Sequence, residues 1–350
     1  MRKLRFLLAL LAIFSLVAAA CGDDDDSTEG ASDDGTETTD DGAEEPAASD
    51  DDGGDDDVEL TQGSDLTFHI VTHSEDGPFW SVVKRGVDAA AADLGVTAVW
   101  LPGFNDATQM VADIEGAVAE GSDGIAASLP DPVALVPVLQ DAVAQGIPVV
   151  TLNSGANDYQ DIGALTHVGQ TEFIAGQAAG ERFNAAGATH VLCGQQEQSN
   201  VGLTERCAGL EDTFSGTVTT DFMDLDADTT AQQAAINTAL SADDSIDAFL
   251  GVGPVIAMSG LRAAQDLGRD MTIGGFDLTP EILGAIEAGD ILFTVDQQQY
   301  LQGYLPVLQL FLFQTNSNVI GGGLPILTGP GFVTADNAGA VLALSEAGTR

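Results

Sequence analysis

Basic side chains are scarce in this chain. Its 350 residues include 10 Lys and Arg against 55 Asp and Glu, a formal net charge of −45 at pH 7. Lys84 is the only lysine after residue 60. Such an acidic surface repels nucleic acid and anionic lipid, which argues against a function that depends on binding either. Because the charges also repel one another and salt screens that repulsion, we expect a salt-rich native environment.

Recognisable catalytic and metal-binding motifs are missing as well. The sequence contains no G-x-S-x-G elbow, no P-loop and no H-E-x-x-H. Gly251-Val-Gly253 begins like a dinucleotide fingerprint, but its sixth position is Ile256 instead of glycine. The four histidines lack the spacing of metal ligands. We therefore expect no metal and no cofactor, and a binding protein is favoured over an enzyme.

The N-terminus has the pattern of an export signal. Arg2, Lys3 and Arg5 precede an apolar stretch over residues 6–17 that is short for a membrane span. Cys21 follows in AAAC, which is similar to the lipobox of bacterial lipoproteins, although Ala18 stands where Leu is usual. We expect a signal peptide over residues 1–20 and lipidation of Cys21. The alternative is cleavage without lipidation.

An acidic segment follows the export signal. Residues 22–60 hold 19 of the 55 acidic side chains, no basic ones and almost nothing large and apolar. Such a segment cannot bury enough apolar area to offset the entropy lost on ordering. We expect residues 21–62 to form a disordered tether that holds a domain away from a membrane. A solubilising tail is the alternative.

From Leu66 onward, short β-branched runs alternate with alanine-rich amphipathic runs. This alternation predicts an α/β fold with parallel sheets covered on both faces. Ten strands exceed a comfortable open sheet, which favours two doubly wound lobes. The expected strands are 66–72, 97–101, 124–128, 148–153, 165–168, 190–193, 218–221, 248–251, 272–276 and 292–295. The expected helices are 79–94, 108–120, 134–145, 172–186, 203–214, 230–242, 255–267, 280–288 and 300–314.

Residues that directly follow the strands are the candidate site, because ligands of doubly wound sheets bind beyond the carboxyl ends of strands. Asp277 offers a carboxylate that could accept hydrogen bonds from adjacent hydroxyls of a ligand. Its alternative role is that of a turn or cap residue. Asn153 and Gln297 both donate and accept, which suits hydroxyls. Glu197 and Asn200 follow another strand, and solvent exposure is their alternative.

The loop after the first strand, read as VTHSEDGPFW over residues 71–80, carries two adjacent aromatics. Phe79 and Trp80 could stack on the apolar face of a sugar ring, or both could belong to the core. They point about 100° apart on a helix, so one inside and one in a cleft is natural. His73 and Asp76 lie in the same loop and are further candidates.

Cys193 and Cys207 are the remaining cysteines. Export places them in an oxidising compartment, so we expect a disulfide, with two buried free thiols as the alternative.

The chain from about Leu66 to its end resembles the ribose/galactose-type periplasmic sugar-binding proteins of ABC transporters. The matching segments are DGPFWSVVKRGVDAAAADLGV (76–96), GIPVVTLNSG (146–155), THVGQTEFIAGQAAGE (166–181), GGFDLTPEILGAIEAGDI (274–291) and FTVDQQQYLQGYLPV (293–307). The resemblance implies a type I periplasmic binding protein fold, with two lobes joined by three hinge crossings. Lobe 1 would comprise 66–168 and 295–325, and lobe 2 would comprise 169–294 and 326–350.

The resemblance also implies roles for individual residues. Phe79 and Trp80 match the family's stacking aromatics, Asp277 its hydroxyl-clamping carboxylate and Gln297 its hinge-side amide. Asn153 stands where ribose binders carry the Asp of an Asp-Arg pair, so that pair is absent. Arg206, near another family arginine, is expected to be structural. Without these arginines, acidic or phosphorylated ligands lack cationic partners.

The resulting expectation is a monomeric, extracytoplasmic lipoprotein that captures a neutral monosaccharide or polyol and delivers it to an ABC permease. One alternative keeps the fold but binds a nucleoside or an autoinducer-like molecule. Another is a sensor that presents ligand to a chemoreceptor or sensor kinase.

Overall fold

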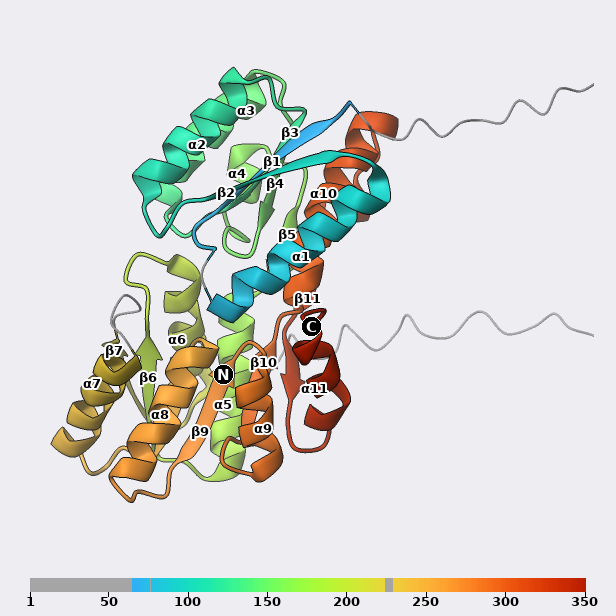
Figure 1. Cartoon of the computed structure of the whole chain (residues 1–350). Helices are drawn as coiled ribbons and strands as arrows, with labels where there is room; N and C mark the ends of the chain where they lie inside the picture. Colours follow the sequence, from blue (N-terminus) through green and yellow to red (C-terminus); the bar gives the residue numbers. More distant parts are fainter. Residues whose placement is uncertain (1–64, 76, 224–228) are drawn as a thin grey trace, which may run out of the picture. The chain divides into compact units, whose positions relative to one another are not determined.

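The computed structural model describes residues 65–75, 77–223 and 229–350. The expected signal peptide, Cys21, the expected acidic tether and Asp76 therefore lie outside the described residues. The described chain forms two six-stranded sheets flanked by helices (Figure 1), which confirms the predicted α/β class and its two lobes. None of the described helices is both long and apolar enough to cross a membrane.

The first sheet has the order β11-β5-β4-β3-β1-β2, and all its strand pairs are parallel. Helices α1 and α10 cover one face, and α2, α3 and α4 cover the other. The strands are β1 (Thr67–Thr72), β2 (Thr97–Pro102), β3 (Gly124–Ser128), β4 (Val149–Leu152), β5 (His167–Gln170) and β11 (Ile326–Gly329). The helices are α1 (Gly77–Leu94), α2 (Ala107–Ala119), α3 (Pro132–Ala144), α4 (Tyr159–Ile162) and α10 (Gln299–Asn316).

The second sheet repeats this order as β12-β10-β9-β8-β6-β7, with β12 antiparallel to β10. Helices α5 and α6 pack on one face, and α7, α8, α9 and α11 on the other. The strands are β6 (His190–Gln195), β7 (Thr217–Phe222), β8 (Ala248–Gly251), β9 (Thr272–Phe276), β10 (Phe293–Asp296) and β12 (Gly331–Val333). The helices are α5 (Glu172–Ala186), α6 (Val201–Thr213), α7 (Thr229–Ala242), α8 (Pro254–Asp266), α9 (Pro280–Ala288) and α11 (Ala338–Glu346), with a short 3₁₀ turn at Ile320–Gly323.

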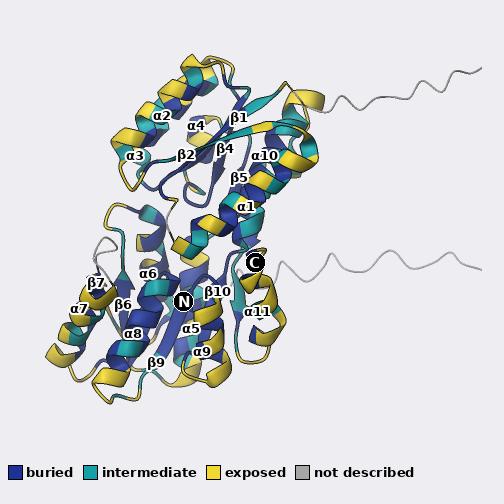
Figure 2. Cartoon of the chain, in the orientation of Figure 1, coloured by how far each residue is buried: buried dark blue, intermediate teal, exposed yellow. Residues whose placement is uncertain are grey.

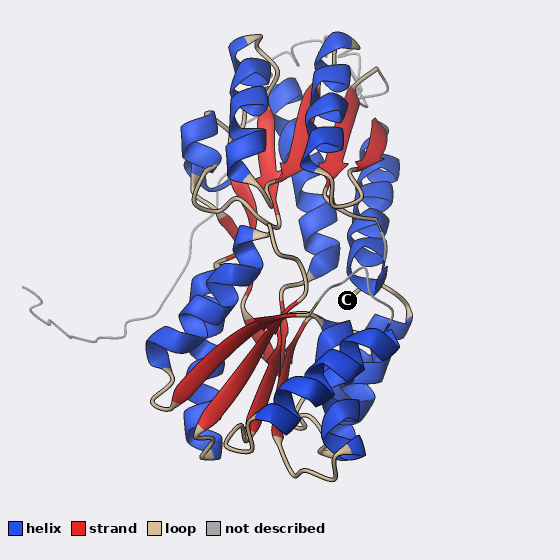
Figure 3. Cartoon of the chain, turned by 90° about the vertical axis from the view of Figure 1, so that its left-hand side faces the viewer, coloured by secondary structure: helices blue, strands red, loops and turns tan. Residues whose placement is uncertain are grey.

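Burial explains why the central strands read as continuous apolar runs. Every residue of β3, β4 and β8 is buried, because helices cover both faces of each sheet (Figures 2 and 3). The edge strands β2 and β7 are half-buried or exposed along their length, and β7 accordingly reads TVTTDF. The apolar pattern of each strand thus reflects whether the strand lies in the centre or at the edge of its sheet.

The chain passes between the two sheets three times. The first crossing joins β5 to α5, the second joins β10 to α10, and the third joins β11 to β12. The third crossing lies at the Gly329–Pro330 bond, which is cis, whereas the sequence placed it near residue 325. Sequence reasoning assigned no element to α4, β11, β12 or α11, and the first three of these have only four, four and three residues.

Candidate functional site

Loops that follow strands of both sheets line one cleft, which is open to solvent. The wall comes from the segments after β1, β4, β6, β8, β9 and β10, as expected for the carboxyl ends of parallel strands. All the candidate ligand residues within the described chain line this cleft: His73, Phe79, Trp80, Asn153, Glu197, Asn200, Asp277 and Gln297.

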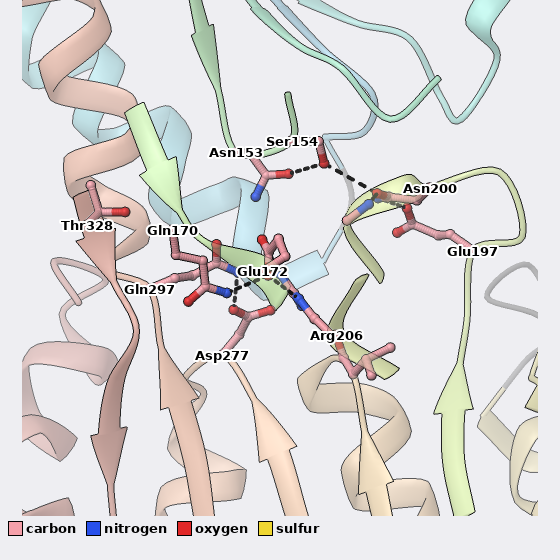
Figure 4. A network of polar contacts seen from close by, with 12 residues as sticks. Asn153, Ser154, Gln170, Glu172, Glu197, Asn200, Arg206, Asp277, Gln297 and Thr328 are labelled. Atoms are coloured by element: carbon pink, nitrogen blue, oxygen red, sulfur yellow. Dashed lines mark hydrogen bonds and ion pairs between the residues drawn. The ribbon is translucent and has the colours of Figure 1, made fainter. Parts of the chain in front are cut away.

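Asp277 is the buried carboxylate at the base of the cleft. It follows β9 with a left-handed φ of 67°, a conformation that Asp and Asn tolerate better than most residues. Its Oδ1 accepts a hydrogen bond from Gln297 Nε2 at 2.5 Å (Figure 4). Burial raises the pKa of Asp277 to about 6, although the Arg206 charge and the Gln297 hydrogen bond oppose the rise. The second oxygen accepts no hydrogen bond within the described chain, so it is available to a ligand hydroxyl.

A chain of side-chain amides connects Asp277 to the other lobe. Gln297 Oε1 accepts from Gln302 Nε2 at 2.8 Å, and Gln302 Oε1 accepts from Asn153 Nδ2 at 3.2 Å. Asn153 follows β4 with a φ of 60°. Because β4 has the same position in the first sheet as β9 has in the second, Asn153 is the counterpart of Asp277. Because each amide is held by its neighbour, the donors and acceptors that face the cleft are fixed in direction.

Arg206 and Glu172 form a buried ion pair in the wall. Arg206 Nε and Nη2 donate to the two carboxylate oxygens of Glu172 at 2.6 and 3.0 Å, and Nη1 donates to the Val252 carbonyl at 2.7 Å. The guanidinium also lies 4.4 Å from the centre of the Phe276 ring. Burial alone would lower the pKa of Arg206, but the charge and hydrogen bonds of Glu172 outweigh it and raise that pKa. Most of the donor capacity of this cation is therefore used within the protein.

Close packing of two helices brings this pair together. A Cβ on Gly176 of α5 would lie 2.1 Å from the Arg206 carbonyl oxygen, and one on Gly209 of α6 would lie 2.0 Å from the Phe173 carbonyl oxygen. Only glycine permits α5 and α6 to approach this closely. Cys207 adds a disulfide to Cys193 of β6, so the expected bond is present and fixes α6 to the sheet.

His73, Glu197 and Asn200 form the rim of the cleft where the lobes meet. Asn200 Nδ2 donates to Glu197 Oε2 at 2.6 Å, and Asn200 Oδ1 caps α6 at the N–H of Gly202. His73 Nδ1 lies 2.9 Å from Ser128 Oγ, and its Nε2 lies 3.8 Å from Glu197 Oε2. Burial lowers the pKa of His73, against the opposing effect of Glu197, so the imidazole is neutral near pH 7.

Direct contacts join the two lobes on the same side of the cleft. The N–H of Val201 donates to the Pro130 carbonyl at 3.1 Å, and Ser154 Oγ donates to Asn200 Oδ1 at 3.3 Å. The loops after β3 and β4 therefore contact the N-terminus of α6.

The aromatic pair at the start of α1 contributes both to the core of the first lobe and to the wall of the cleft. Trp80 is 5% exposed and belongs to the core of the first lobe, yet it also borders the cleft. Phe79 is half-buried and lies edge-on to Trp80, with ring centres 5.0 Å apart. His73 also packs edge-on against Trp80, with ring centres 4.7 Å apart. The three rings form one cluster of edge-to-face contacts beside the cleft.

The sequence prediction named neither Glu172 nor Ser154 as a ligand residue, although Ser154 lies in one of the segments that follow a predicted strand, and it treated Arg206 as structural. All three line the cleft, although the bonds of Arg206 show that it also organises the wall. Only the positions of Glu172 and Arg206 in the sequence could have indicated that they line the cleft. Glu172 is the first residue of α5, and Arg206 lies in α6, whose N-cap is Asn200. No group of three or more His, Cys, Asp or Glu in the described residues is arranged to hold a metal ion.

Comparison with known proteins gives matches over most of the described chain. The family model for the periplasmic binding protein domain matches residues 68–313. The xylose/arabinose-binding protein of Sulfolobus acidocaldarius is 28% identical over 285 residues, which cover 76% of this chain and 70% of that protein. The ribose import binding protein of Bacillus subtilis is 24% identical over 246 residues, covering 69% and 79% respectively.

Among solved structures, a carbohydrate transporter from Acidothermus cellulolyticus in complex with myo-inositol is 40% identical to this chain. The two structures superpose with a TM-score of 0.79 over 81% of this chain and 99% of the other.

Proposed function

The chain belongs to the periplasmic binding protein domain family, and we propose that it captures a neutral monosaccharide or polyol in the cleft between its lobes for an ABC importer. The similar proteins named above are xylose/arabinose-, ribose- and carbohydrate-binding proteins, and the one with the highest identity among them holds myo-inositol. A cyclic polyol is therefore the first ligand to test.

The arrangement around Asp277 is the observation that carries the proposal. A sugar or polyol presents adjacent hydroxyls around an apolar ring face, so it needs acceptors and donors at the edge and a flat surface above. Asp277 and Gln297 supply the polar edge, and Phe79 and Trp80 supply the surface. A carboxylate that accepts hydrogen bonds from hydroxyls contributes about 1.5–3 kcal/mol for each bond.

The charges of the cleft favour a neutral ligand over an anionic one. Three carboxylates line it, and Arg206 is its only cationic side chain among the described lining residues. Because that guanidinium is already paired with Glu172, a sugar acid or phosphate would meet uncompensated negative charge.

Ligand capture involves closure of the two lobes about the three crossings. Amide hydrogen bonds connect Asn153 in the first lobe to Gln297 at the second crossing, next to Asp277. A ligand bridging Asn153 and Asp277 favours the arrangement that brings both to it, so binding energy selects the closed state. A membrane permease would then recognise that state.

The N-terminal sequence supports a location outside the cytoplasm for this activity. An export signal over residues 1–20, lipidation of Cys21 and the acidic segment 21–62 would tether the binding domain to the membrane surface. Metabolic labelling with a radioactive fatty acid tests the anchor: the wild-type chain incorporates label, and Cys21→Ser does not. Labelling of Cys21→Ser would contradict it.

A thermal-shift screen tests the ligand class. We expect one or more members of a panel of pentoses, hexoses, inositols and nucleosides to raise the melting temperature of the wild type. A ligand at 100 times its dissociation constant stabilises by about 2.7 kcal/mol, which such a screen detects. Asp277→Ala is the control, and equal stabilisation of both proteins would place the ligand elsewhere.

A further inference from the structure

A buried carboxylate lies beside the cleft without lining it. Asp296 is the last residue of β10, and only 2% of its side chain is exposed. Arg350 Nε donates a hydrogen bond to its Oδ2 at 2.8 Å, and Arg350 Nη2 forms an ion pair with the same oxygen at 2.6 Å. Removing one partner of such a pair leaves an uncompensated buried charge, which is strongly unfavourable. Arg350 therefore compensates the charge of a buried carboxylate beside the cleft.

The other oxygen of Asp296 organises the second crossing. Its Oδ1 accepts the backbone N–H of Gln298 at 2.8 Å. Gln298 has a φ of 54°, which is uncommon for a residue other than glycine. Its side chain donates to the Thr328 carbonyl at 2.6 Å and so joins the second crossing to the third. The carboxylate thus holds a strained backbone turn on one side and Arg350 on the other.

The residue between Asp296 and Gln298 is Gln297, which donates a hydrogen bond to Asp277, the carboxylate proposed to bind the ligand. Asp296 is therefore connected to the site in two ways: it is the neighbour of Gln297 in the sequence, and its negative charge acts electrostatically on Asp277. Besides burial, the charged groups that act on the pKa of Asp277 come from three elements: Arg206 of α6, Glu172 of α5 and Asp296 of β10. Asp296 acts to raise that pKa.

The tail that carries Arg350 also contacts the first lobe. The carbonyl of Ala347 accepts a hydrogen bond from Arg85 Nη1 of α1 at 2.7 Å. Helix α11, which precedes the tail, packs against α9 of the second lobe. Figure 1 shows the C-terminal end beside α11 and near α1. Residues 347–350 therefore link α1, the second crossing and the second lobe.

We propose that Arg350 is a positioning residue for the ligand site, which acts through Asp296 on the Gln297–Gln298 turn and on Asp277. It touches no residue that lines the cleft in any hydrogen bond or ion pair of the described chain. The expected effect of Arg350 on ligand affinity rests on the proposed function. Its electrostatic effect on Asp277 can be measured without ligand.

The test compares four forms of the full chain: wild type, Arg350→Gln, Asp296→Asn/Arg350→Gln and Arg262→Gln. Arg262→Gln is the matched control, because it removes an arginine from an exposed ion pair with Glu281 in the same lobe. The first readout is the titration of the Asp277 carboxyl carbon by NMR in the ligand-free protein. The second is the dissociation constant of the best ligand from the panel at pH 6.5 and 8.5.

In Arg350→Gln, the unneutralised Asp296 raises the titration midpoint of Asp277. An extra elementary charge at about 10 Å shifts a pKa by roughly one unit at an effective dielectric constant of 20, so we expect a rise of up to about one unit. Ligand affinity falls severalfold at pH 6.5 and much less at pH 8.5. The double variant returns the midpoint to the wild-type value, and Arg262→Gln leaves it unchanged.

An Asp277 midpoint that is the same in Arg350→Gln and in the wild type would overturn the proposal. So would an affinity loss of equal size at both pH values, because a purely structural role would produce that result. If the wild type binds no member of the panel, the proposed function fails, whereas the ligand-free titration still decides the role of Arg350.

Discussion

At the scale of single residues, Asp277 and Gln297 account for most of the proposed recognition. Asp277 uses one oxygen for Gln297 and leaves the other for the ligand. The left-handed backbone at Asp277 turns its side chain from the end of β9 toward the cleft. Asp is among the residue types that tolerate a positive φ, so this one residue provides the turn toward the cleft.

Replacement of Asp277 by alanine should weaken ligand binding about 100-fold. The carboxylate oxygen that faces the ligand is lost, and two charge-assisted hydrogen bonds together contribute about 3 kcal/mol or more. Calorimetric titration of the wild type and the variant measures the ratio. Glu281→Ala in α9 is the matched control, because that carboxylate is exposed and lies outside the cleft. A loss of less than threefold in Asp277→Ala would remove the residue from the site.

The raised pKa of Asp277 predicts that affinity depends on pH. Ligand hydroxyls donate to the ionised carboxylate, so protonation near pH 6 competes with binding. We expect the dissociation constant to increase about tenfold between pH 7 and pH 5. The ligand-free fold shows the opposite trend: because the folded-state pKa lies above the unfolded value, this group favours the fold more as the pH falls from about 6 to about 4.

Asp277→Asn supplies the control for both trends. It cannot titrate in this range, so its weaker binding should vary little from pH 7 to pH 5. An equally steep profile in Asp277→Asn would assign the pH dependence to another group.

At the scale of secondary structure, the α5/α6 pair determines the wall of the cleft. Glycine at the contact allows the two helices to approach until Arg206 reaches Glu172, and the disulfide holds α6 on β6. The N-terminus of α6 also contacts the first lobe through Val201. One helix therefore orients an ion pair, a cap residue and a contact between the lobes.

Gly209→Ala should separate α5 from α6 and destabilise the protein by about 1–3 kcal/mol, because its Cβ would lie 2.0 Å from the Phe173 carbonyl oxygen. Ligand affinity should fall as well, since Arg206 moves with α6. Gly284→Ala is the matched control: it lies in α9 with open space around its Cβ, and it should stabilise by about 0.5–1 kcal/mol. Denaturant unfolding measures both. Equal stability of the two variants would contradict the close helix contact.

The elements that sequence predicted are those whose pattern is local. The alternation of apolar runs located ten of the described strands, because central strands are buried on both faces. Strands β11 and β12 have four and three residues, and their place depends on pairing with β5 and β10 across long separations. The same limit applies to the cleft. The sequence located lining residues that follow strands, whereas the Glu172–Arg206 pair depends on a helix contact that no local pattern reveals.

At the scale of the whole molecule, the two sheets have the same strand order, and the cleft uses equivalent positions of both. Asn153 follows β4 and Asp277 follows β9, the third strand from the same edge in each sheet. The amide chain through Gln302 and Gln297 connects them. In the proposed function, recognition of one ligand from both lobes would couple lobe closure to binding.

The excess of negative charge predicts that salt stabilises the folded chain. With 55 acidic and 10 basic side chains, mutual repulsion is large at low ionic strength and is screened at high ionic strength. The free energy of unfolding should rise between about 0.1 M and 2 M NaCl. A sucrose solution of equal osmolality is the control for effects other than screening. No difference between the two NaCl concentrations would contradict a role for repulsion.

Calorimetric titration of the wild-type chain with myo-inositol, the panel sugars and their acidic counterparts, such as inositol phosphate and xylonate, tests the central claim most directly. The account predicts that at least one neutral polyol or sugar binds one molecule per chain, and that its anionic counterpart binds at least 100-fold more weakly. Equal or tighter binding of the anion, or no binding by any neutral member, would contradict it.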